Sequence, residues 1–269
     1  SAGDWKELRT LRRCGFNRLS LGMQSADDEE LSEIGRVHTM AQTEAAVEAA
    51  RKAKFQNLSL DLIYGLPHQT LEGWQKTLSA ALDLTPEHLS CYGLKVEEGT
   101  PLFARRGTAG LPGDDAQADM YLYTVEFLKA QGYEQYEISN FAKPGYEGRH
   151  NLIYWDCGDY LGIGPAAHSC MGGKRFYYPA DTDAFLRDEA APVMDGGCGA
   201  EDYLILQLRL RKGLNLDEYK KRYGRELSTA QRAFVQNCVK SGYASFDGRT
   251  LALTPAGLIV QNSILAELL

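Results

Sequence analysis

Hydrophobic and polar positions alternate with two different periods over the first hundred residues. Short runs of alternating character predict three strands, at residues 17–24, 57–64 and 88–96. Runs with a helical period predict three helices, at residues 27–36, 43–54 and 71–84. Strands separated by helices of this length are typical of right-handed βαβ units, which build a parallel sheet. The first third of the chain is therefore expected to belong to an α/β domain.

The first two predicted strands each have a polar face. In residues 17–24 (NRLSLGMQ), one face carries Ser20, Gly22 and Gln24. In residues 57–64 (NLSLDLIY), one face carries Ser59 and Asp61. A parallel strand that is buried on both sides is normally apolar on both. The small polar face favours a barrel whose lumen holds a ligand, and the alternative is an open sheet with one poorly covered face.

The remainder of the chain changes character twice. Residues 114–131 predict a long helix and residues 132–139 a strand, whereas the aromatic and Gly-rich stretch 140–178 shows no period and is expected to be a long loop. Further helices are predicted at residues 201–211, 216–223, 228–241 and 255–269, and a hairpin around Asp247-Gly248 at residues 243–253. Helices followed by a hairpin and a last helix indicate a winged-helix-like domain.

Composition narrows the class of protein. The 269 residues include 29 basic and 36 acidic side chains, for a net charge of −7, which argues against a basic nucleic-acid-binding surface. No apolar run approaches the roughly 20 residues that cross a bilayer. The six cysteines are scattered without a CxxC pair, and most are expected to be small buried side chains in a reducing, cytoplasmic protein.

Five segments together resemble one family. They are LGMQS (residues 21–25), GRVHT (35–39), LDLIYGLPHQT (60–70), YEISNFAKPGYEGRHNLIYW (136–155) and YLGIGPAAHS (160–169). They resemble the oxygen-independent coproporphyrinogen III oxidase-like radical-SAM proteins. Within that family the string HNxxYW at residues 150–155 is similar to the HemW branch of heme chaperones. The resemblance runs from about residue 5 to the end of the chain.

The resemblance implies an α/β fold: a partial (βα) radical-SAM barrel, truncated at its N-terminus, followed by a small helical winged-helix-like C-terminal domain. We expect the barrel part at residues 1–106, a middle segment with HNxxYW at 107–198 and the C-terminal domain at 199–269. The family's CxxxCxxC loop, whose thiolates hold a [4Fe–4S] cluster, does not occur in the sequence. Three missing βα units correspond to roughly 100 residues, and without them the chain is not expected to hold the cluster or to cleave S-adenosylmethionine (SAM).

The same resemblance implies residues that contact SAM, namely Gln24, Arg36 and Asp61, with Lys95 as a further candidate. Gln24 and Asp61 lie near the ends of predicted parallel strands, where α/β barrels bind ligands. Asp61 could accept hydrogen bonds from ribose hydroxyls, and Arg36 could pair with a carboxylate. The alternatives are structural: Asp61 could cap a loop, Arg36 could form a surface ion pair, and Lys95 could be solvated.

His150 is the candidate heme ligand that the resemblance implies. Imidazole is a good ligand for heme iron. Tyr154 and Trp155 could stack on the porphyrin, and Arg149 could pair with a propionate. The alternative is that His150 is an ordinary structural histidine.

The sequence is compatible with three functions. The first is a heme chaperone that passes heme to client proteins, through which it would contact membranes, with SAM and a [4Fe–4S] cluster in the complete protein. The second is coproporphyrinogen III dehydrogenase, a radical-SAM enzyme of porphyrin biosynthesis. The third is a nucleic-acid-binding module, which is disfavoured because Arg232 and Lys240 are the only basic residues of the predicted helix 228–241.

Overall fold

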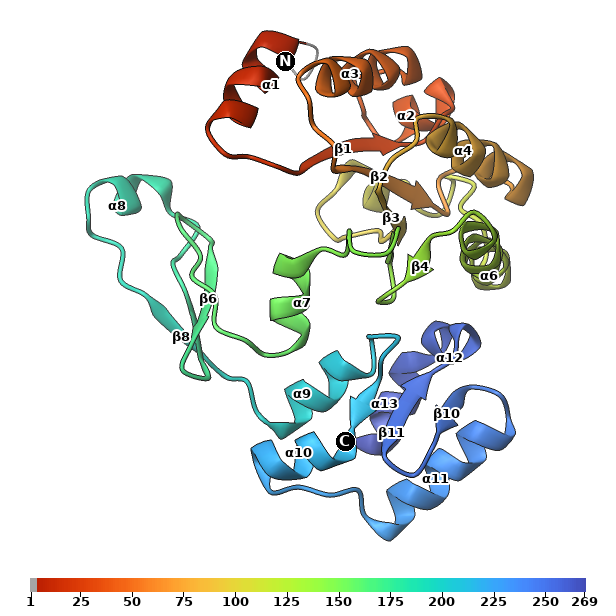
Figure 1. Ribbon diagram of the computed structural model, residues 1–269, viewed down its shortest axis with the longest axis vertical. Coiled ribbons are helices and arrows are strands. Elements are labelled where there is room, and N and C mark those ends of the chain that lie inside the picture. The colour runs from red at the N-terminus through yellow and green to blue at the C-terminus, as the bar shows by residue number, and fades with distance from the viewer. Residues whose placement is uncertain (1–3) are drawn as a thin grey trace. The chain divides into compact units, whose positions relative to one another are not determined.

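The computed structural model describes residues 4–269, which form two compact units. One unit ends at Glu147 and the other is Gly148–Leu269. Figure 1 shows the first in red to yellow-green and the second in green to blue. The expected division at residues 106 and 198 stays a prediction.

A five-stranded sheet organises the first unit, in the order β1-β2-β3-β5-β4. Its strands are β1 (Leu19–Gln24), β2 (Leu58–Tyr64), β3 (His88–Gly93), β4 (Glu134–Gln135) and β5 (Asn140–Ala142). The first three are parallel, as the alternation of strands and helices predicted. β5 runs antiparallel to β3 and to β4. The expected strand at 132–139 is mostly wrong, because only two of its residues pair in β4 before the chain turns into β5.

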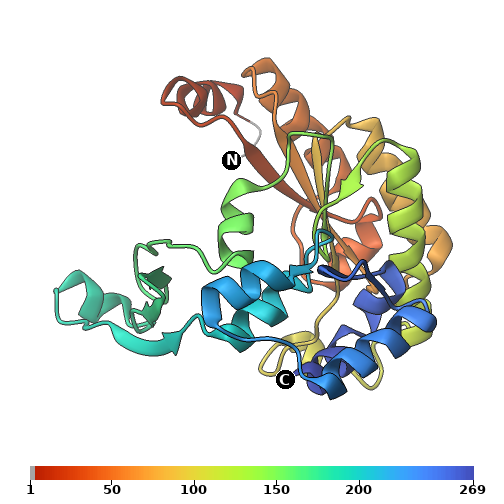
Figure 2. The ribbon, with the colours of Figure 1, turned by 60° about the horizontal axis from the view of Figure 1, so that its bottom comes forward.

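The helices of this unit are α1 (Trp5–Arg13), α2 (Asp28–Glu33), α3 (Met40–Lys52), α4 (Leu71–Asp83), α5 (Pro101–Ala104) and α6 (Asp114–Ala130). In Figure 2, α3, α4 and α6 lie along one side of the sheet. The β2 residues Leu58, Leu60 and Leu62 are at most 1% exposed. The apolar face of the strands therefore forms the core with the helices, and their polar residues occupy the opposite face.

Residues 148–199 contain more secondary structure than expected. Helix α7 (Arg149–Trp155) is followed by a three-stranded antiparallel sheet of β6 (His168–Met171), β7 (Lys174–Tyr177) and β8 (Val193–Gly197), with α8 (Thr182–Leu186) before β8. The expectation of one long loop at 140–178 was wrong. Its elements are three to seven residues long, and α7 has no side-chain cap at its first residue, so no period could develop in the sequence.

The last seventy residues form the winged-helix-like arrangement. Its elements are α9 (Ala200–Gln207), β9 (Leu214–Asn215), α10 (Leu216–Tyr223), α11 (Thr229–Lys240), β10 (Ala244–Phe246), β11 (Thr250–Leu253), α12 (Pro255–Ile259) and α13 (Gln261–Leu268). The predicted hairpin is confirmed as β10 and β11. The expected single last helix is interrupted at Val260, whose ψ of 18° ends α12. Among residues 4–269, no helix is long and apolar enough to span a membrane.

Candidate functional site

Asp61 is held in place from the neighbouring strand. The Ser20 hydroxyl on β1 lies 3.0 Å from each carboxylate oxygen of Asp61 on β2, so it can donate to either. Gly22 is the register partner of Asp61, and it has no side chain to cover the carboxylate. Asp61 is half-buried and is the central residue of β2, whereas Gln24 is the last residue of β1, so only Gln24 lies at a strand end as expected. The carboxylate is therefore fixed but still able to accept further hydrogen bonds.

Gln24 reaches the same position by an irregularity at the end of β1. The register shifts between Gly22 and Gln24, and Gln24 has a left-handed φ of 64°. Its amide nitrogen lies 2.6 Å from the point that a Cβ on Gly22 would occupy. The side chain thus folds back over Gly22, the residue that pairs with Asp61. The structure brings the Gln24 amide and the Asp61 carboxylate to the same part of the polar face.

The GRVHT segment connects to the end of β1. The ring nitrogen Nε2 of His38 lies 3.2 Å from the carbonyl oxygen of Met23. Thr39 begins α3 with a capping box that includes Gln42. Between these anchors Arg36 is exposed and follows Gly35, whose φ is 71°. His38 and Thr39 thus have structural roles, and Arg36 remains available for a ligand.

Lys95 lies outside this arrangement. It follows β3, its side chain is 82% exposed, and its ammonium group pairs with Glu97 at 2.7 Å. The side chain of Lys95 therefore pairs with Glu97 and not with Asp61.

A second polar cluster on the same sheet is centred on His88. Its Nδ1 lies 2.8 Å from Ser59 Oγ and 3.4 Å from an Arg18 nitrogen, and its Nε2 lies 2.8 Å from Tyr136 Oη. Burial, together with the positive charge of Arg18, lowers the pKa of His88 to about 3. His88 is therefore neutral at physiological pH. The sequence pattern did not single out His88, although Ser59, its register partner, was on the predicted polar face.

The Asp61 carboxylate and the Gln24 amide have the chemistry to bind a nucleoside. A carboxylate accepts hydrogen bonds from vicinal hydroxyls, and a primary amide both donates and accepts. Within residues 4–269, no group of three or more His, Cys, Asp and Glu side chains is arranged to hold a metal ion.

Helix α7 presents His150 together with Tyr154. His150 Nε2 and Tyr154 Oη are 2.5 Å apart, and the two ring centroids are separated by 4.8 Å. Tyr154 also meets Tyr160 edge-on, with 4.4 Å between centroids. His150 and Tyr154 are exposed. Tyr160 extends this aromatic row, and its position in the YLGIGPAAHS segment was the only sequence signal for it.

Arg149 and Trp155, the other two α7 residues expected to contact heme, are not part of the pair formed by His150 and Tyr154. Arg149 is exposed in the first turn. Trp155 is half-buried, with the Arg209 guanidinium 5.9 Å from its ring centroid. Trp155 is five positions from His150, so the two do not share a helix face. The structure thus joins His150 with Tyr154 and directs Trp155 towards α9.

The C-terminal end of α7 is firmly anchored within its own unit. Lys212 and Gln207 each contact the Asp156 carboxylate at 2.9 Å. Arg222 donates to the carbonyl oxygens of Asp156 and Cys157, at 2.8 and 3.0 Å. Cationic donors at a helix C-terminus complement its dipole and satisfy its free carbonyls. The His150 helix therefore has a rigid base.

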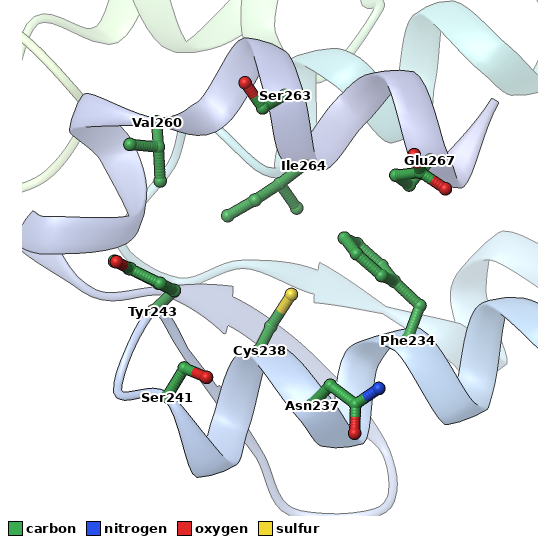
Figure 3. Close-up of a pocket in the computed structure, with 9 residues that line it drawn as sticks. All are labelled: Phe234, Asn237, Cys238, Ser241, Tyr243, Val260, Ser263, Ile264 and Glu267. Carbon is green, nitrogen blue, oxygen red and sulfur yellow. The ribbon is translucent and has the colours of Figure 1, made fainter.

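A cavity of about 470 Å³ opens in the C-terminal domain. Figure 3 shows Cys238 on one side and Ile264 on the other, with Phe234 and Tyr243 flanking them. The lining is mostly apolar, and none of the predicted site residues belongs to it.

Comparisons with known proteins identify both ends of the chain. A sequence profile of the Radical SAM superfamily matches residues 1–81, and one of the HemN C-terminal domain matches residues 200–260. The chain is similar to solved coproporphyrinogen III oxidase (HemN) from Escherichia coli, a radical SAM enzyme, with a TM-score of 0.78 over 98% of this chain and 67% of that one. The identity is 22%, so this similarity establishes the fold alone.

Curated relatives are more similar in sequence. Heme chaperone HemW of Bacillus subtilis is 33% identical over 98% of this chain and 72% of its own length. Heme chaperone HemW of Mycobacterium tuberculosis (strain H37Rv) is 34% identical over 98% of this chain and 69% of its own. The Escherichia coli protein of the same name is 45% identical over 58% of this chain and 41% of its own.

Proposed function

Since this chain belongs to the heme chaperone HemW family of radical SAM proteins, we propose that it binds heme through α7 and passes the heme to client proteins. The observation that carries the proposal is the exposed imidazole of His150, which lies beside the ring of Tyr154 on a helix with an anchored base. Neutral imidazole is a good ligand for heme iron. An exposed site suits a cargo that must be released.

The surroundings of His150 match the shape of heme. Tyr154 and Tyr160 provide flat aromatic surface for a porphyrin edge. Arg149, in the turn that contains His150, can pair with a propionate. Trp155 would contribute by holding α7 against the segment that follows α9, through Arg209, rather than by stacking on the porphyrin.

Radical SAM membership implies SAM and a [4Fe–4S] cluster. Together these supply one-electron chemistry when bound. We propose that Asp61 and Gln24 contact the nucleoside part of SAM, since Asp61 is the register partner of Gly22 and the Gln24 amide lies over Gly22. Arg36 is exposed in a loop tied to β1 and is proposed to pair with a carboxylate, and Lys95 remains the weakest candidate. Among residues 4–269, no group of three or more His, Cys, Asp and Glu side chains could hold the iron–sulfur cluster.

Two other functions receive less support. Coproporphyrinogen III dehydrogenase rests on a likeness that establishes only the fold. For nucleic-acid binding, α11 offers Arg232 and Lys240, and Arg232 is engaged with Leu227 and Glu226. We also propose a cytoplasmic location, because all six cysteines are free. Contact with membranes would then occur through client proteins.

Heme titration followed through the Soret band tests the proposal. The unmodified chain is expected to bind near one equivalent, and His150→Ala is expected to weaken binding at least tenfold. His68→Ala is the matched control, because His68 is an exposed histidine of the other unit. Equal binding by His150→Ala and the control would exclude His150 as the ligand.

A further inference from the structure

Three cysteine side chains meet in the second unit, although they are far apart in the sequence. The sulfur atoms of Cys170 and Cys198 are 3.7 Å apart, and 28 positions separate the two residues. Cys198 also forms a side-chain hydrogen bond with Cys157. Cys198 is thus the central thiol, in contact with both of the others.

Backbone hydrogen bonds fix each of these thiols. Cys170 in β6 exchanges both of its backbone hydrogen bonds with Tyr160, at 2.8 and 2.9 Å. Cys198 follows β8, and its N–H donates to the Gly173 carbonyl at 3.1 Å. Cys157 follows α7, and its N–H donates to the Tyr154 carbonyl at 3.1 Å. The convergence of the sulfurs therefore follows from the fold and not from the rotation of a free side chain.

We propose that Cys198 is an oxidative modification site, at which a peroxide produces a disulfide with Cys170 and Cys157 is the thiol that can exchange into it. The sulfur–sulfur distance must shorten from 3.7 Å to about 2.0 Å. This needs side-chain rotation and a small shift of β8, which is exposed along its whole length, so the shift would displace no core side chain.

The reaction balances with a peroxide as the only added reagent. The Cys198 thiolate attacks one peroxide oxygen, the O–O bond breaks, and the sulfur becomes a sulfenic acid while water leaves. Cys170 then attacks the sulfenic sulfur and displaces a second water. Two thiols are oxidised by two electrons in all, and hydrogen peroxide is reduced to two waters.

Exposure decides which sulfur the peroxide meets. Cys198 is partly exposed, whereas Cys170 is 0% and Cys157 is 4% exposed. An oxidant from solution therefore reaches Cys198 first. The buried thiols then act as resolving groups, which stops the oxidation before the irreversible sulfinic and sulfonic acids.

Burial sets the rate of this reaction. Desolvation raises the pKa of all three thiols, that of Cys170 to about 11. The charged and titratable groups around them are Asp159, Arg175, Tyr160, Tyr223, Asp202 and Arg222. Because the thiolate is the nucleophile, oxidation is slow at neutral pH and accelerates as the pH rises.

The disulfide would close a covalent loop. Residues between Cys170 and Cys198 include β7, α8 and β8, so the bond would tie the last strand of the small sheet to its first. Formation of this disulfide needs neither heme nor SAM, so its test, made on the chain without them, does not depend on the proposed function.

The test uses the complete chain, treated with hydrogen peroxide and then alkylated. Cys170 and Cys198 should then carry no alkyl group, and peptide mapping without reductant should show the two residues linked with the loss of two hydrogens. Dithiothreitol should reverse both changes. In Cys170→Ser the link should move to Cys157, and in Cys198→Ser it should disappear. Cys14→Ser is the matched control and should behave as the unmodified chain, because Cys14 is exposed and distant in sequence.

Peptide mapping of the unmodified chain tests the Cys170–Cys198 disulfide even where a variant fails to fold. Oxidation of Cys198 only to sulfinic or sulfonic acid, or a disulfide that does not include Cys198, would overturn the proposal. So would an unchanged mass of the Cys198 peptide after complete oxidation of exposed Cys14.

Discussion

Tyr154 Oη and His150 Nε2 lie 2.5 Å apart on successive turns of α7. Residues four apart on a helix face the same side, so this pairing is built into the helix itself. The proposed iron ligand therefore already has a hydrogen-bond partner, and iron must displace the tyrosine to bind at Nε2.

Tyr154→Phe is accordingly expected to strengthen heme binding. The phenylalanine ring keeps the aromatic surface. In the variant, iron binding no longer breaks the hydrogen bond between Tyr154 and His150, which is worth about 1 kcal/mol net, so heme affinity should rise about fivefold. Soret titration measures the change, with Tyr178→Phe as a control elsewhere in the same unit. Weaker binding by Tyr154→Phe would mean that the hydroxyl itself contacts heme or its iron.

Ser20→Ala is expected to weaken SAM binding by roughly threefold to tenfold, the effect of losing about 1 kcal/mol of hydrogen bonding that orients the carboxylate. The Asp61 carboxylate would stay in place but lose the donor that orients it. Asp61→Ala should weaken binding further. Equilibrium dialysis with labelled SAM gives the affinities, and Ser79→Ala on the exposed surface of α4 serves as control. If Ser20→Ala binds as tightly as the control, the carboxylate needs no positioning by Ser20.

His88 should make the stability of the protein depend on pH. Its pKa is lowered to about 3 in the folded protein, mainly by burial, whereas an unfolded histidine titrates near 6.5. Between these values the unfolded chain binds the additional proton, so the free energy of unfolding falls as the pH decreases below about 6.5. The slope from one proton is about 1.4 kcal/mol per pH unit.

Urea unfolding of the unmodified chain and of His88→Asn between pH 4.5 and 7.5 measures this contribution. Other groups affect both proteins equally, so the difference in slope isolates His88. The variant should show the shallower slope whatever its stability at pH 7.5. Parallel slopes would show that the pKa of His88 is not lowered in the folded protein.

Gly257→Ala is expected to destabilise the C-terminal domain by more than about 2 kcal/mol, through overpacking against backbone. A Cβ at this position would collide with the Tyr243 carbonyl oxygen, which cannot move because it accepts a hydrogen bond from Thr254. Thermal unfolding followed by circular dichroism measures the loss. Gly199→Ser is the control, since its Cβ would make only an ordinary contact. Comparable melting of both variants would contradict the predicted collision.

The sequence predicted the elements that have long, regular patterns. The parallel strands β1, β2 and β3 follow from alternation and from the helices between them, and the β10–β11 hairpin follows from Asp247-Gly248. These features depend on local residue preferences, which the chain displays directly.

Features that depend on tertiary contacts were missed. The pairing of Ser20 with Asp61 needs the register of two strands, and the meeting of Cys170 with Cys198 needs the whole small sheet. Helix α7 was taken for a loop because its seven residues have no side-chain cap and are too few to show a period. Its stability comes from Arg222, whose contact with the helix end lies 66 positions away.

The fold of Gln24 over Gly22 restricts how this part of the chain can change during evolution. Any side chain at position 22 would occupy the space of the Gln24 amide, so a substitution there removes the function of two residues at once. The displaced amide is the end of a flexible side chain, so such a variant could still fold. In homologous chains the two positions should therefore vary together: a glutamine at position 24 should be accompanied by glycine at position 22. Loss of that glycine would mark a branch that has stopped using the amide.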